Sequence, residues 1–461
     1  MINFNELPTE WLRMAYGWIW SAPLILFIVG VGVYLTIRLR GIQFRFLGYA
    51  LKVALGPQHD QDDRGDISHF QSLMTALAAT IGIGNIAGVS TAIVTGGLGA
   101  LFWMWVTALI GMATRYAESA LAVKYRTTDC KGEMCGGPMY YIEYGLGWKW
   151  LSISFAAFGA LSALGGGNML QANSVADVIS SMFAVNPLWV GIVVAILTGL
   201  TLIGGIKSIG RVAGFLVPMM ALFYIGGAGI ILVTLHDQIP GVVMAIFKTA
   251  FTGQAAVGGF AGSTIILAVQ MGVSRGLMTS EAGMGTASIA AAAAKTDVPG
   301  RQALVSMTGC FLATVVMCTV TGLVLGVTGV LGTVKPDGTM LTGAAMTVYA
   351  FETQYWWGAY IVTIGLMLFA FTTLIGWAYY GEKCVEYLFG EKMVYFYRIL
   401  FVLIIIPGAV LELDFVWKFS DVFNALMTIP NLIGLCALTG VVVDETRTFL
   451  KVLEHEKAEQ K

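Results

Sequence analysis

The sequence predicts an all-α integral membrane protein with about eleven transmembrane helices: one extra N-terminal helix, then ten core helices that form a 5+5 inverted repeat. Three observations carry this prediction. Hydrophobic residues make up 57% of the 461 residues and charged residues 11%, whereas a soluble domain carries roughly a quarter charged residues. Windows of about 19 residues divide the apolar sequence into separate spans. Glycines interrupt two of these runs, which predicts discontinuous first and sixth core helices.

The expected spans follow one another from the amino terminus. Their approximate centres are Phe27, Ile83, Thr107, Ala163, Ala195, Tyr224, Ala268, Ala313, Leu366, Leu403 and Leu432. Residues 137–145 and 241–251 are too short to span and are expected to be interfacial helices. The first residues, MINFNELPTEW, contain acids and no cationic region, so they do not resemble a cleaved signal peptide. The apolar run 18–37 is therefore expected to remain as the extra membrane helix.

Basic residues predict the direction of the chain through the membrane. Most lysines and arginines fall in segments on one side of the eleven-span arrangement. They are Arg38, Arg40, Arg45, Lys52, Arg64, Lys124, Arg126, Lys131, Lys207, Arg211, Lys295, Arg301, Lys383, Lys392, Arg447, Lys451, Lys457 and Lys461. The other side keeps little beyond Arg13, Lys248, Lys335 and Lys418. The positive-inside rule then places the amino terminus outside and the carboxyl terminus in the cytoplasm of a prokaryotic cell, with the protein in its plasma membrane.

The odd number of helices in each set of five predicts an inverted repeat, because the second set must run opposite to the first. We expect residues 1–66 to form the accessory helix and a cytoplasmic loop, and residues 67–236 to form the first repeat. Residues 237–445 would form an interfacial helix and the second repeat, and residues 446–461 a cytoplasmic tail. Inverted repeats with broken helices at matching positions are typical of alternating-access transporters.

The glycine-rich interruptions fall at corresponding positions of the two repeats. The first interrupts the apolar stretch 76–105 at residues 82–85, GIGN, and the second lies within residues 268–285. The glycines of the second are Gly272, Gly276, Gly283 and Gly285. A bilayer offers no water to bare backbone groups, so such breaks favour a transporter that holds a small solute or ion there. The net charge of −1 gives no basis for nucleic-acid binding.

Oxygen atoms near the first break and in the ninth span are candidate sodium ligands. The carbonyl groups of Ala78 and Ile81 precede the break, and the hydroxyl groups of Thr372 and Thr373 lie side by side in the ninth span. The carbonyl of Phe369, one turn earlier, could join them. Hard oxygen ligands of this kind suit sodium where helix geometry leaves carbonyls free. The alternative is that both threonines bond back to their own helix.

The breaks also let a substrate approach the main chain. A carboxylate would suit the free N–H groups of Ile83 and Gly84, where a half-helix begins. Asn85 supplies an oxygen at the same depth, and Gly272 of the sixth core helix is expected to border the same site.

The third core helix and the ninth span offer further substrate contacts. The run Gly165-Gly166-Gly167-Asn168 opens space, and Gln171 after it provides both a donor and an acceptor. Trp377 lies four residues after Thr373, on the same helix face, and could form a wall of a small pocket. The alternatives are a bond between packed helices for Gln171 and simple packing for Trp377.

Four ionisable residues fall inside predicted spans or at their inner ends: Arg115, Glu118, Arg275 and Glu281. Arg115 and Glu118 are three residues apart and therefore neighbours on one helix. Paired charges are tolerated inside a membrane, so we expect structural pairs, across helices, near a cytoplasmic gate.

Two other patterns point to different chemistry. Residues 62–66 spell DDxxD, as in membrane prenyltransferases that bind magnesium pyrophosphate, but no second acidic cluster follows and a solvated loop fits better. Cys130 and Cys135 share a loop, and one CxxxxC pair is weak evidence for zinc, so we expect reduced thiols. The four histidines are too widely spread for a metal site.

With these residues in view, the chain resembles the bacterial and archaeal alanine/glycine:sodium symporter family from about residue 68 to residue 443. The matching segments are GIGNIAGVSTAIVTGGLGALFWMW, GMATRYAESALAVKYR, GGPMYYIE, SRGLMTSEAGMG and TLIGWAYYGEK, in that order. The resemblance implies the leucine-transporter-type fold of the amino acid-polyamine-cation superfamily, sodium coupling and a small neutral amino acid as substrate. It implies that sodium binds at Ala78, Ile81, Phe369, Thr372 and Thr373. It implies a substrate pocket of Thr80, Gly84, Asn85, Gly166, Gln171, Thr373 and Trp377.

The sequence departs from the family pattern at two places. Leu98 stands where the family usually has proline, and Met278-Thr279-Ser280 replaces the commoner Phe-Ser-Asn before the second break. The second departure leaves the size of the pocket and the exact substrate open.

We therefore expect a sodium-coupled symporter that imports alanine, glycine or both by alternating access. Its expected partners are the amino acid, sodium and the lipid bilayer, with no catalytic residue, no cofactor, no nucleic acid and no obligate protein partner. Proton coupling within the same fold is the main alternative. A passive channel and a membrane-embedded enzyme that uses the Asp62–Asp66 cluster are the others.

Overall fold

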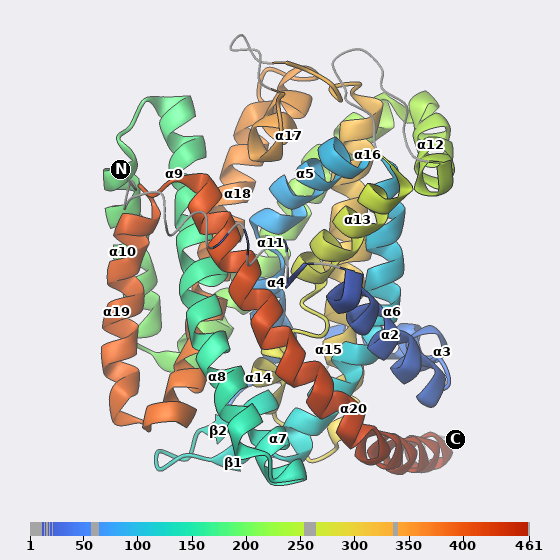
Figure 1. Ribbon diagram of the computed structural model, residues 1–461, viewed down its shortest axis with the longest axis vertical. Helices are drawn as coiled ribbons and strands as arrows, with labels where there is room; N and C mark the ends of the chain where they lie inside the picture. The colour runs from blue at the N-terminus through green and yellow to red at the C-terminus, as the bar shows by residue number, and fades with distance from the viewer. Residues whose placement is uncertain are drawn as a thin grey trace.

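The structure is a computed structural model that describes most of the chain. The described residues are Leu12, Met14, Gly17, Ile19 and Trp20, and residues 22–56, 64–252, 264–334 and 340–459. Within them the protein is a bundle of helices with one antiparallel hairpin of two short strands, β1 (Thr127–Thr128) and β2 (Met134–Cys135) (Figure 1).

The helices have the following bounds. They are α2 (Ala22–Arg38), α3 (Ile42–Leu55), α4 (His69–Thr80), η1 (Ile83–Asn85), α5 (Ala87–Gly96), α6 (Gly99–Lys124), α7 (Pro138–Leu146), α8 (Lys149–Leu164), η2 (Gly165–Met169), α9 (Leu170–Phe183), α10 (Pro187–Leu202), α11 (Gly205–Thr234), η3 (His236–Gln238), α12 (Ile239–Thr252), α13 (Ile265–Ser280), α14 (Thr286–Ala292), α15 (Pro299–Cys310), η4 (Phe311–Cys318), α16 (Thr319–Val327), α17 (Gly343–Glu352), α18 (Gly358–Phe389), α19 (Lys392–Gly408) and α20 (Leu413–Glu459).

The first core helix is discontinuous, as the sequence predicts. Its first half, α4, begins at a capping box in which Ser68 Oγ accepts the Gln71 N–H (3.0 Å) and Gln71 Oε1 accepts the Ser68 N–H (3.1 Å). The helix ends at Thr80, and the chain becomes extended at Gly82, with φ −127° and ψ −158°. A single 3₁₀ turn, η1, then leads into α5, so the break lies at the glycines that predict it.

The sixth core helix is also discontinuous, between α13 and α14. Glu281, Gly283 and Gly285 adopt left-handed backbone conformations, with φ of 52°, 92° and 80°. Such angles suit glycine but are uncommon for glutamate. Gly272 and Gly276 lie inside α13 against α6, so only two of the four glycines belong to the break.

Five helical segments are long and apolar enough to cross a membrane unaided, among the residues that the structure describes. They are Lys149–Ser180, Gly205–Thr234, Pro299–Val327, Gly358–Phe389 and Phe415–Glu456.

Other expected spans fall short of this criterion for physical reasons. Two are divided by breaks, α10 and α19 have 16 and 17 residues, and charged side chains lower the hydropathy of the 26-residue α6. The extra helix at the amino terminus, α2, turns by 80° into α3. The number eleven therefore stays a prediction, as do the domain boundaries.

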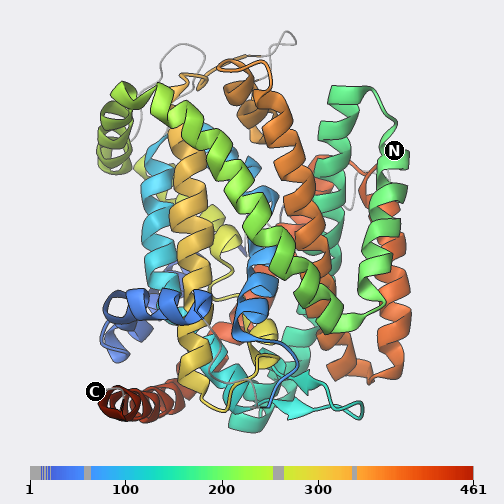
Figure 2. The same ribbon diagram turned by 180° about the vertical axis from the view of Figure 1, so that it is seen from behind.

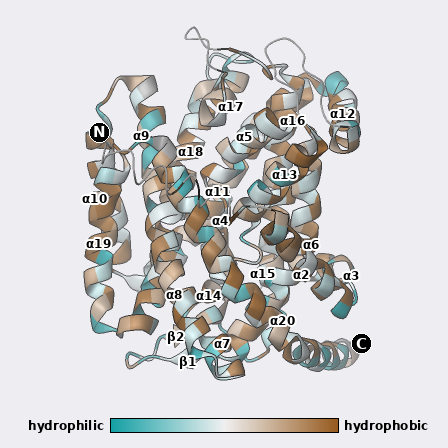
Figure 3. Ribbon diagram, viewed as in Figure 1, coloured by the Kyte–Doolittle hydropathy of each residue, from teal (hydrophilic) through white to brown (hydrophobic). Residues whose placement is uncertain are grey.

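Short helices occur where interfacial helices were expected. These are α7 and α12, which lie at opposite ends of the bundle in Figure 1. Figure 3 shows hydrophobic residues along the peripheral helices α10 and α19 and hydrophilic residues at the hairpin and the carboxyl-terminal end. Many apolar side chains of α10 and α19 are exposed, as expected for surfaces that face lipid.

The two broken helices lie inside a ring of continuous ones. Helix α13 packs against α6 and α5, α4 packs against α11 and α18, and α20 packs against α8. Seen from behind, α11 crosses the bundle obliquely beside α16 and α18 (Figure 2). This arrangement places both breaks in the interior.

Candidate functional site

The two breaks border one small cavity inside the bundle. The space in it that is open to the centre of a water molecule is about 30 Å³, enough for about two waters. Its lining includes Thr80, Gly84, Gly166, Gln171, Thr373 and Trp377, all predicted from the sequence. The remaining lining residues are Ala79, Gly82, Met278, Glu281, Met284, Ser420 and Asn424. The cavity therefore joins α4, η1, η2, α9, α13, α18 and α20.

Gln171 is placed by the π-helical segment η2, which joins α8 to α9. Such segments are frequent at functional sites. Gln171 Nε2 donates to the Gly166 carbonyl (3.0 Å), while its buried Oε1 has no hydrogen-bond partner among the described residues. A Cβ placed on Gly82 would lie 3.3 Å from that oxygen, so the free acceptor faces the first break. Gly167 allows Trp377 to pack directly on η2.

Four of the proposed sodium ligands lie together between α4 and α18. Thr373 Oγ1 is 3.1 Å from the Ala78 carbonyl oxygen and 2.8 Å from the Phe369 carbonyl oxygen. Thr372 Oγ1 is 3.0 Å from the same Phe369 oxygen and 3.4 Å from Met220 Sδ. Both threonines thus bond back to their own helix, but Thr373 also bonds across to the broken one. The cluster supplies carbonyl and hydroxyl oxygens of the kind that a hard cation needs.

The backbone of the first break is partly bonded and partly free. Ile81 is the buried residue that caps α4, and its carbonyl lies next to the break. The Gly82 N–H donates to Asn85 Oδ1 (3.1 Å), and the Asn85 N–H donates to the Gly82 carbonyl (3.2 Å). Among the described residues, no backbone hydrogen bond at the break starts from the N–H of Ile83 or Gly84. Gly84 lines the cavity, whereas Ile83 is buried beside it and is not one of the lining residues.

Two residues that the sequence placed beside the substrate face elsewhere. Asn85 Nδ2 donates to the Ala313 carbonyl in the π-helical segment η4 (2.7 Å), and Thr321 Oγ1 donates to the Asn85 carbonyl (2.9 Å). Asn85 thus fixes the break against η4 and α16. Gly272 lies against Trp103 of α6, where any side chain would clash. Asn85 and Gly272 are therefore not proposed as substrate contacts. The sequence did not reveal this, because residue type and spacing do not show which neighbour a buried residue faces.

Glu118 on α6 holds the second break. Its Oε1 accepts the N–H of Gly283 (2.9 Å), the N–H of Gly285 (3.2 Å) and a hydrogen from Asn431 Nδ2 (2.7 Å). The first two donors belong to the turn between α13 and α14 and have no helical partner there. The structural ion pair across helices that was expected for Glu118 is therefore replaced by hydrogen bonds to the break and to Asn431.

Arg115, one turn before Glu118, contacts the other end of the same break. Its Nη1 donates to the Ser280 carbonyl at the end of α13 (2.6 Å) and lies 3.4 Å from Thr80 Oγ1 at the end of α4. Glu281 follows Ser280, lines the cavity and accepts a hydrogen bond from Thr286 Oγ1 (3.1 Å). Arg115 of α6 thus contacts the residues at which α4 and α13 end, next to the two breaks.

Arg275 pairs with Asp421, which the sequence analysis did not consider. Arg275 Nη1 lies 3.4 Å from Asp421 Oδ2, and the guanidinium lies 4.9 Å from the centre of the Trp417 ring. Both charged side chains are almost fully buried. Because Met278 and Ser420 line the cavity, this ion pair joins its two walls on α13 and α20.

The sequence analysis missed the cavity residues of α20. Ser420 and Asn424 line the cavity, and Asn424 Oδ1 accepts a hydrogen bond from Ser162 Oγ. A signal was present, since Ser420, Asn424, Thr428 and Asn431 recur every three or four residues in an apolar run. This spacing places polar groups on one helix face.

Comparison of the sequence with known proteins identifies the family of this chain. The model of the sodium:alanine symporter family matches residues 5–461. The chain belongs to that family. Sodium/alanine symporter AgcS of Methanococcus maripaludis is 53% identical over 445 residues, which cover 95% of this chain and 97% of AgcS. An uncharacterized transporter of Haemophilus influenzae is 46% identical, with 95% of each chain covered.

A solved structure supports the predicted fold. The crystal structure of MhsT in complex with L-phenylalanine matches with a TM-score of 0.61 and 16% identity, over 85% of this chain and 93% of MhsT. At this identity the likeness concerns the fold alone. This family member is therefore a multi-pass membrane transporter of the leucine-transporter type, and not an enzyme.

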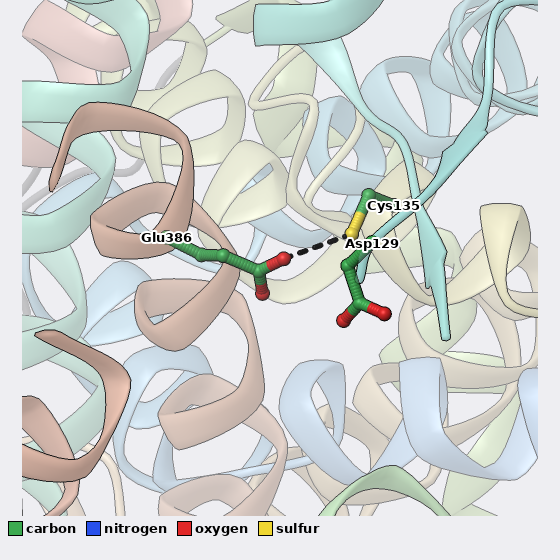
Figure 4. Close-up of side chains that lie close together, drawn as sticks. All are labelled: Asp129, Cys135 and Glu386. Atoms are coloured by element: carbon green, nitrogen blue, oxygen red, sulfur yellow. Dashed lines mark hydrogen bonds between the residues drawn. The ribbon is translucent and has the colours of Figure 1, made fainter. Parts of the chain in front are cut away.

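A second cluster lies away from the cavity, at the β-hairpin. Asp129, Cys135 and Glu386 bring three possible metal ligands together (Figure 4). However, Lys383 Nζ lies 2.9 Å from Glu386 Oε2, 3.4 Å from Cys135 Sγ and 3.7 Å from Asp129 Oδ2, where a metal would sit. Burial raises the pKa of the Cys135 thiol to about 12, so it stays protonated and donates to Glu386 Oε1 (3.0 Å). The cluster is therefore an ion-pair network.

The acidic DDxxD segment has a structural partner at the same hairpin. Asp66 Oδ2 accepts a hydrogen bond from the Met134 N–H (2.7 Å), which ties the segment before α4 to β2. Asp62 and Asp63 lie outside the described residues. One aspartate of the segment, Asp66, therefore has a structural role at the hairpin.

Proposed function

We propose that this chain is a sodium-coupled symporter that moves alanine, or glycine, through the cavity between the two breaks. The observation that carries the proposal is the shared position of Thr373. Its hydroxyl group belongs to the oxygen cluster beside Ala78 and also lines the cavity. An ion and a substrate bound on the two sides of this residue would each stabilise the arrangement that the other needs, which is the requirement for coupling.

The substrate pose follows from the free polar groups of the cavity. The carboxylate would accept hydrogen bonds from the N–H groups of Ile83 and Gly84, where the positive end of the η1–α5 half-helix favours an anion. The ammonium group would donate to the free Oε1 of Gln171, a buried acceptor that gains a partner only when a donor enters. Thr80, Gly166 and Trp377 would enclose the rest of the molecule.

Sodium would bind between α4 and α18. The carbonyls of Ala78, Ile81 and Phe369 and the hydroxyls of Thr372 and Thr373 would supply five oxygen ligands. The ion would replace the hydrogen bonds that Thr373 now makes, and its charge would hold the two helices together more strongly than one hydroxyl does. Sodium would therefore favour the state that binds substrate.

The cavity would select a small side chain by volume. The space open to the centre of a water molecule is about 30 Å³, so the cavity must widen to admit even alanine, and the flexible side chains of Met278 and Met284 border it. Methionine can move to admit a substrate but still fills the space that a large side chain would need. One methylene group is worth about 1–3 kcal/mol, so discrimination among glycine, alanine and serine would be modest.

Two further features complete the proposal. The amino terminus would lie outside and the carboxyl terminus in the cytoplasm, because the basic residues of the predicted loops gather on one side. Residues 67–236 and 237–445 would form the two inverted repeats. The Arg275–Asp421 ion pair, which joins α13 to α20 beside the cavity, would open when substrate enters or leaves.

Uptake by the purified protein in proteoliposomes tests this function. We expect radiolabelled alanine to accumulate under an inward sodium gradient and not under a proton gradient in sodium-free buffer. Alanine loaded inside should accelerate uptake, because a carrier returns faster with substrate bound. Accumulation under a proton gradient alone would favour proton coupling. Uptake without this acceleration would favour a channel.

A further inference from the structure

The first two described helices carry a cationic, partly apolar surface that transport does not use. It consists of Arg38, Arg40, Arg45 and Lys52 together with Phe44 and Leu55, and all six side chains are exposed. Helix α2 ends at Arg38, and α3 leaves it at an angle of 80°. In both views α3 lies at the edge of the bundle (Figures 1 and 2). We call this the α3 surface.

The backbone conformation of two residues forms the turn between α2 and α3. Arg40 and Gly41 both adopt left-handed conformations, with φ of 55° and 63°. The Gly41 N–H donates to the Thr36 carbonyl (2.8 Å), which ends α2 by a backbone hydrogen bond. Gln43, buried on α3, donates to the Leu109 carbonyl of α6 (3.3 Å). The direction of α3 is therefore fixed against the core.

Two cations of the α3 surface contact aromatic rings in the part of the chain that the structure describes. Among the described residues, no carboxylate forms an ion pair with Arg38, Arg40, Arg45 or Lys52. Two of them lie over aromatic rings instead: Arg38 is 5.9 Å from the Tyr34 ring centre and Arg45 is 5.4 Å from that of Phe46. By contrast, Lys124 and Arg301 pair with glutamates of α20. Within the described part of the chain, the α3 surface therefore carries positive charge that no ion pair neutralises.

The arrangement of side chains along α3 is that of a helix that lies in a membrane interface. Ile42, Gln43, Ala50 and Ala54 are buried against the protein. Arg45 and Lys52 are seven residues apart and share a second face, and Phe44 and Leu55 extend a neighbouring apolar face. A helix with one cationic and one apolar face suits the boundary between lipid headgroups and acyl chains.

We propose that the α3 surface binds the headgroups of anionic phospholipids, with Arg45 and Lys52 on the phosphates and Phe44 and Leu55 among the acyl chains. Charge complementarity carries the proposal, because basic side chains beside a membrane helix attract anionic lipid. Helix α3 packs on α15 and α4, and α4 carries Ala78. Lipid bound here would therefore contact a helix that packs on an element of the candidate site, although its binding does not depend on transport.

Native mass spectrometry of the purified protein tests the proposal directly. The protein would be titrated with phosphatidylglycerol and, separately, with phosphatidylcholine of the same acyl chains. We expect phosphatidylglycerol adducts at lower lipid concentration than phosphatidylcholine adducts. The Arg45→Gln/Lys52→Gln double variant should need about 30-fold more phosphatidylglycerol, about 2 kcal/mol for the two charges.

A matched control removes two charges elsewhere. Lys131, between β1 and β2, and Lys392, the first residue of α19, are exposed and lie away from α3 in the sequence, so Lys131→Gln/Lys392→Gln should bind phosphatidylglycerol as the wild type does. Equal binding by the α3 variant and the wild type would overturn the proposal, and so would equal affinity for the two lipids. A dimer lost in the α3 variant, without lipid adducts, would assign the surface to a second copy of the chain.

Discussion

Replacing Glu118 by alanine should abolish sodium-driven alanine uptake. The substitution removes the acceptor of three buried donors, the N–H groups of Gly283 and Gly285 and the amide of Asn431. Each unsatisfied buried donor costs about 1–3 kcal/mol, so the break between α13 and α14 would abandon its present geometry. Loss of even 2–3 kcal/mol from this state corresponds to roughly a 30- to 150-fold fall in the competent population. Initial uptake rates in proteoliposomes measure the effect.

Two further variants separate this role from general stability. Glu118→Gln keeps an oxygen acceptor in the same place and should recover part of the activity. Ser119→Ala, the adjacent residue of α6, removes a buried hydrogen bond to Ser306 that does not touch the break, and should transport normally. Both should elute like the wild type in size-exclusion chromatography. If Glu118→Ala folds and transports at the wild-type rate, Glu118 does not hold the break.

Replacing Thr373 by valine should raise the sodium concentration for half-maximal uptake at least tenfold. Valine keeps the branched shape but removes the hydroxyl that lies 3.1 Å from the Ala78 oxygen and 2.8 Å from the Phe369 oxygen. A hydrogen bond or ligand to a charged group contributes about 1.5–3 kcal/mol, and about 1.4 kcal/mol is a factor of ten. Uptake measured against sodium concentration, with ionic strength held constant, gives the shift.

The control is another buried threonine of the same helix. Thr363 lies on α18, and its hydroxyl has no hydrogen-bond partner among the described residues. Thr363→Val should therefore leave the sodium curve unchanged. An unaltered curve for Thr373→Val, with normal expression, would move the ion away from the oxygen cluster.

Much of the fold could be predicted because its causes are local. A glycine run in an apolar stretch disfavours helix wherever the protein places it, so the break at Gly82 was readable from the sequence. The second break was located only approximately, since four glycines were candidates. Gly283 and Gly285 adopt positive φ, whereas Gly272 and Gly276 serve close packing on α6. Glycine suits both a positive φ and close packing, and the surrounding structure determines which of the two applies at a given position.

The candidate site could be predicted where periodicity along one helix was enough. Thr373 and Trp377 share a face of α18 by their spacing, and both line the cavity. The partners of Asn85, Arg275 and Glu118 on other helices lie 146 or more residues away in the chain. Such contacts depend on how helices pack, which the spacing within one helix does not report. The polar face of α20 could be predicted from spacing alone, because Ser420, Asn424, Thr428 and Asn431 recur every three or four residues.

The central claim is that alanine and sodium bind together at the two breaks. Equilibrium binding of radiolabelled alanine to the purified protein, titrated with sodium at constant ionic strength, tests it most directly. We predict that alanine binds with an affinity that rises with sodium and is lost in potassium, and that Gln171→Ala weakens it at every sodium concentration. Alanine binding of equal affinity in sodium and in potassium would contradict the claim.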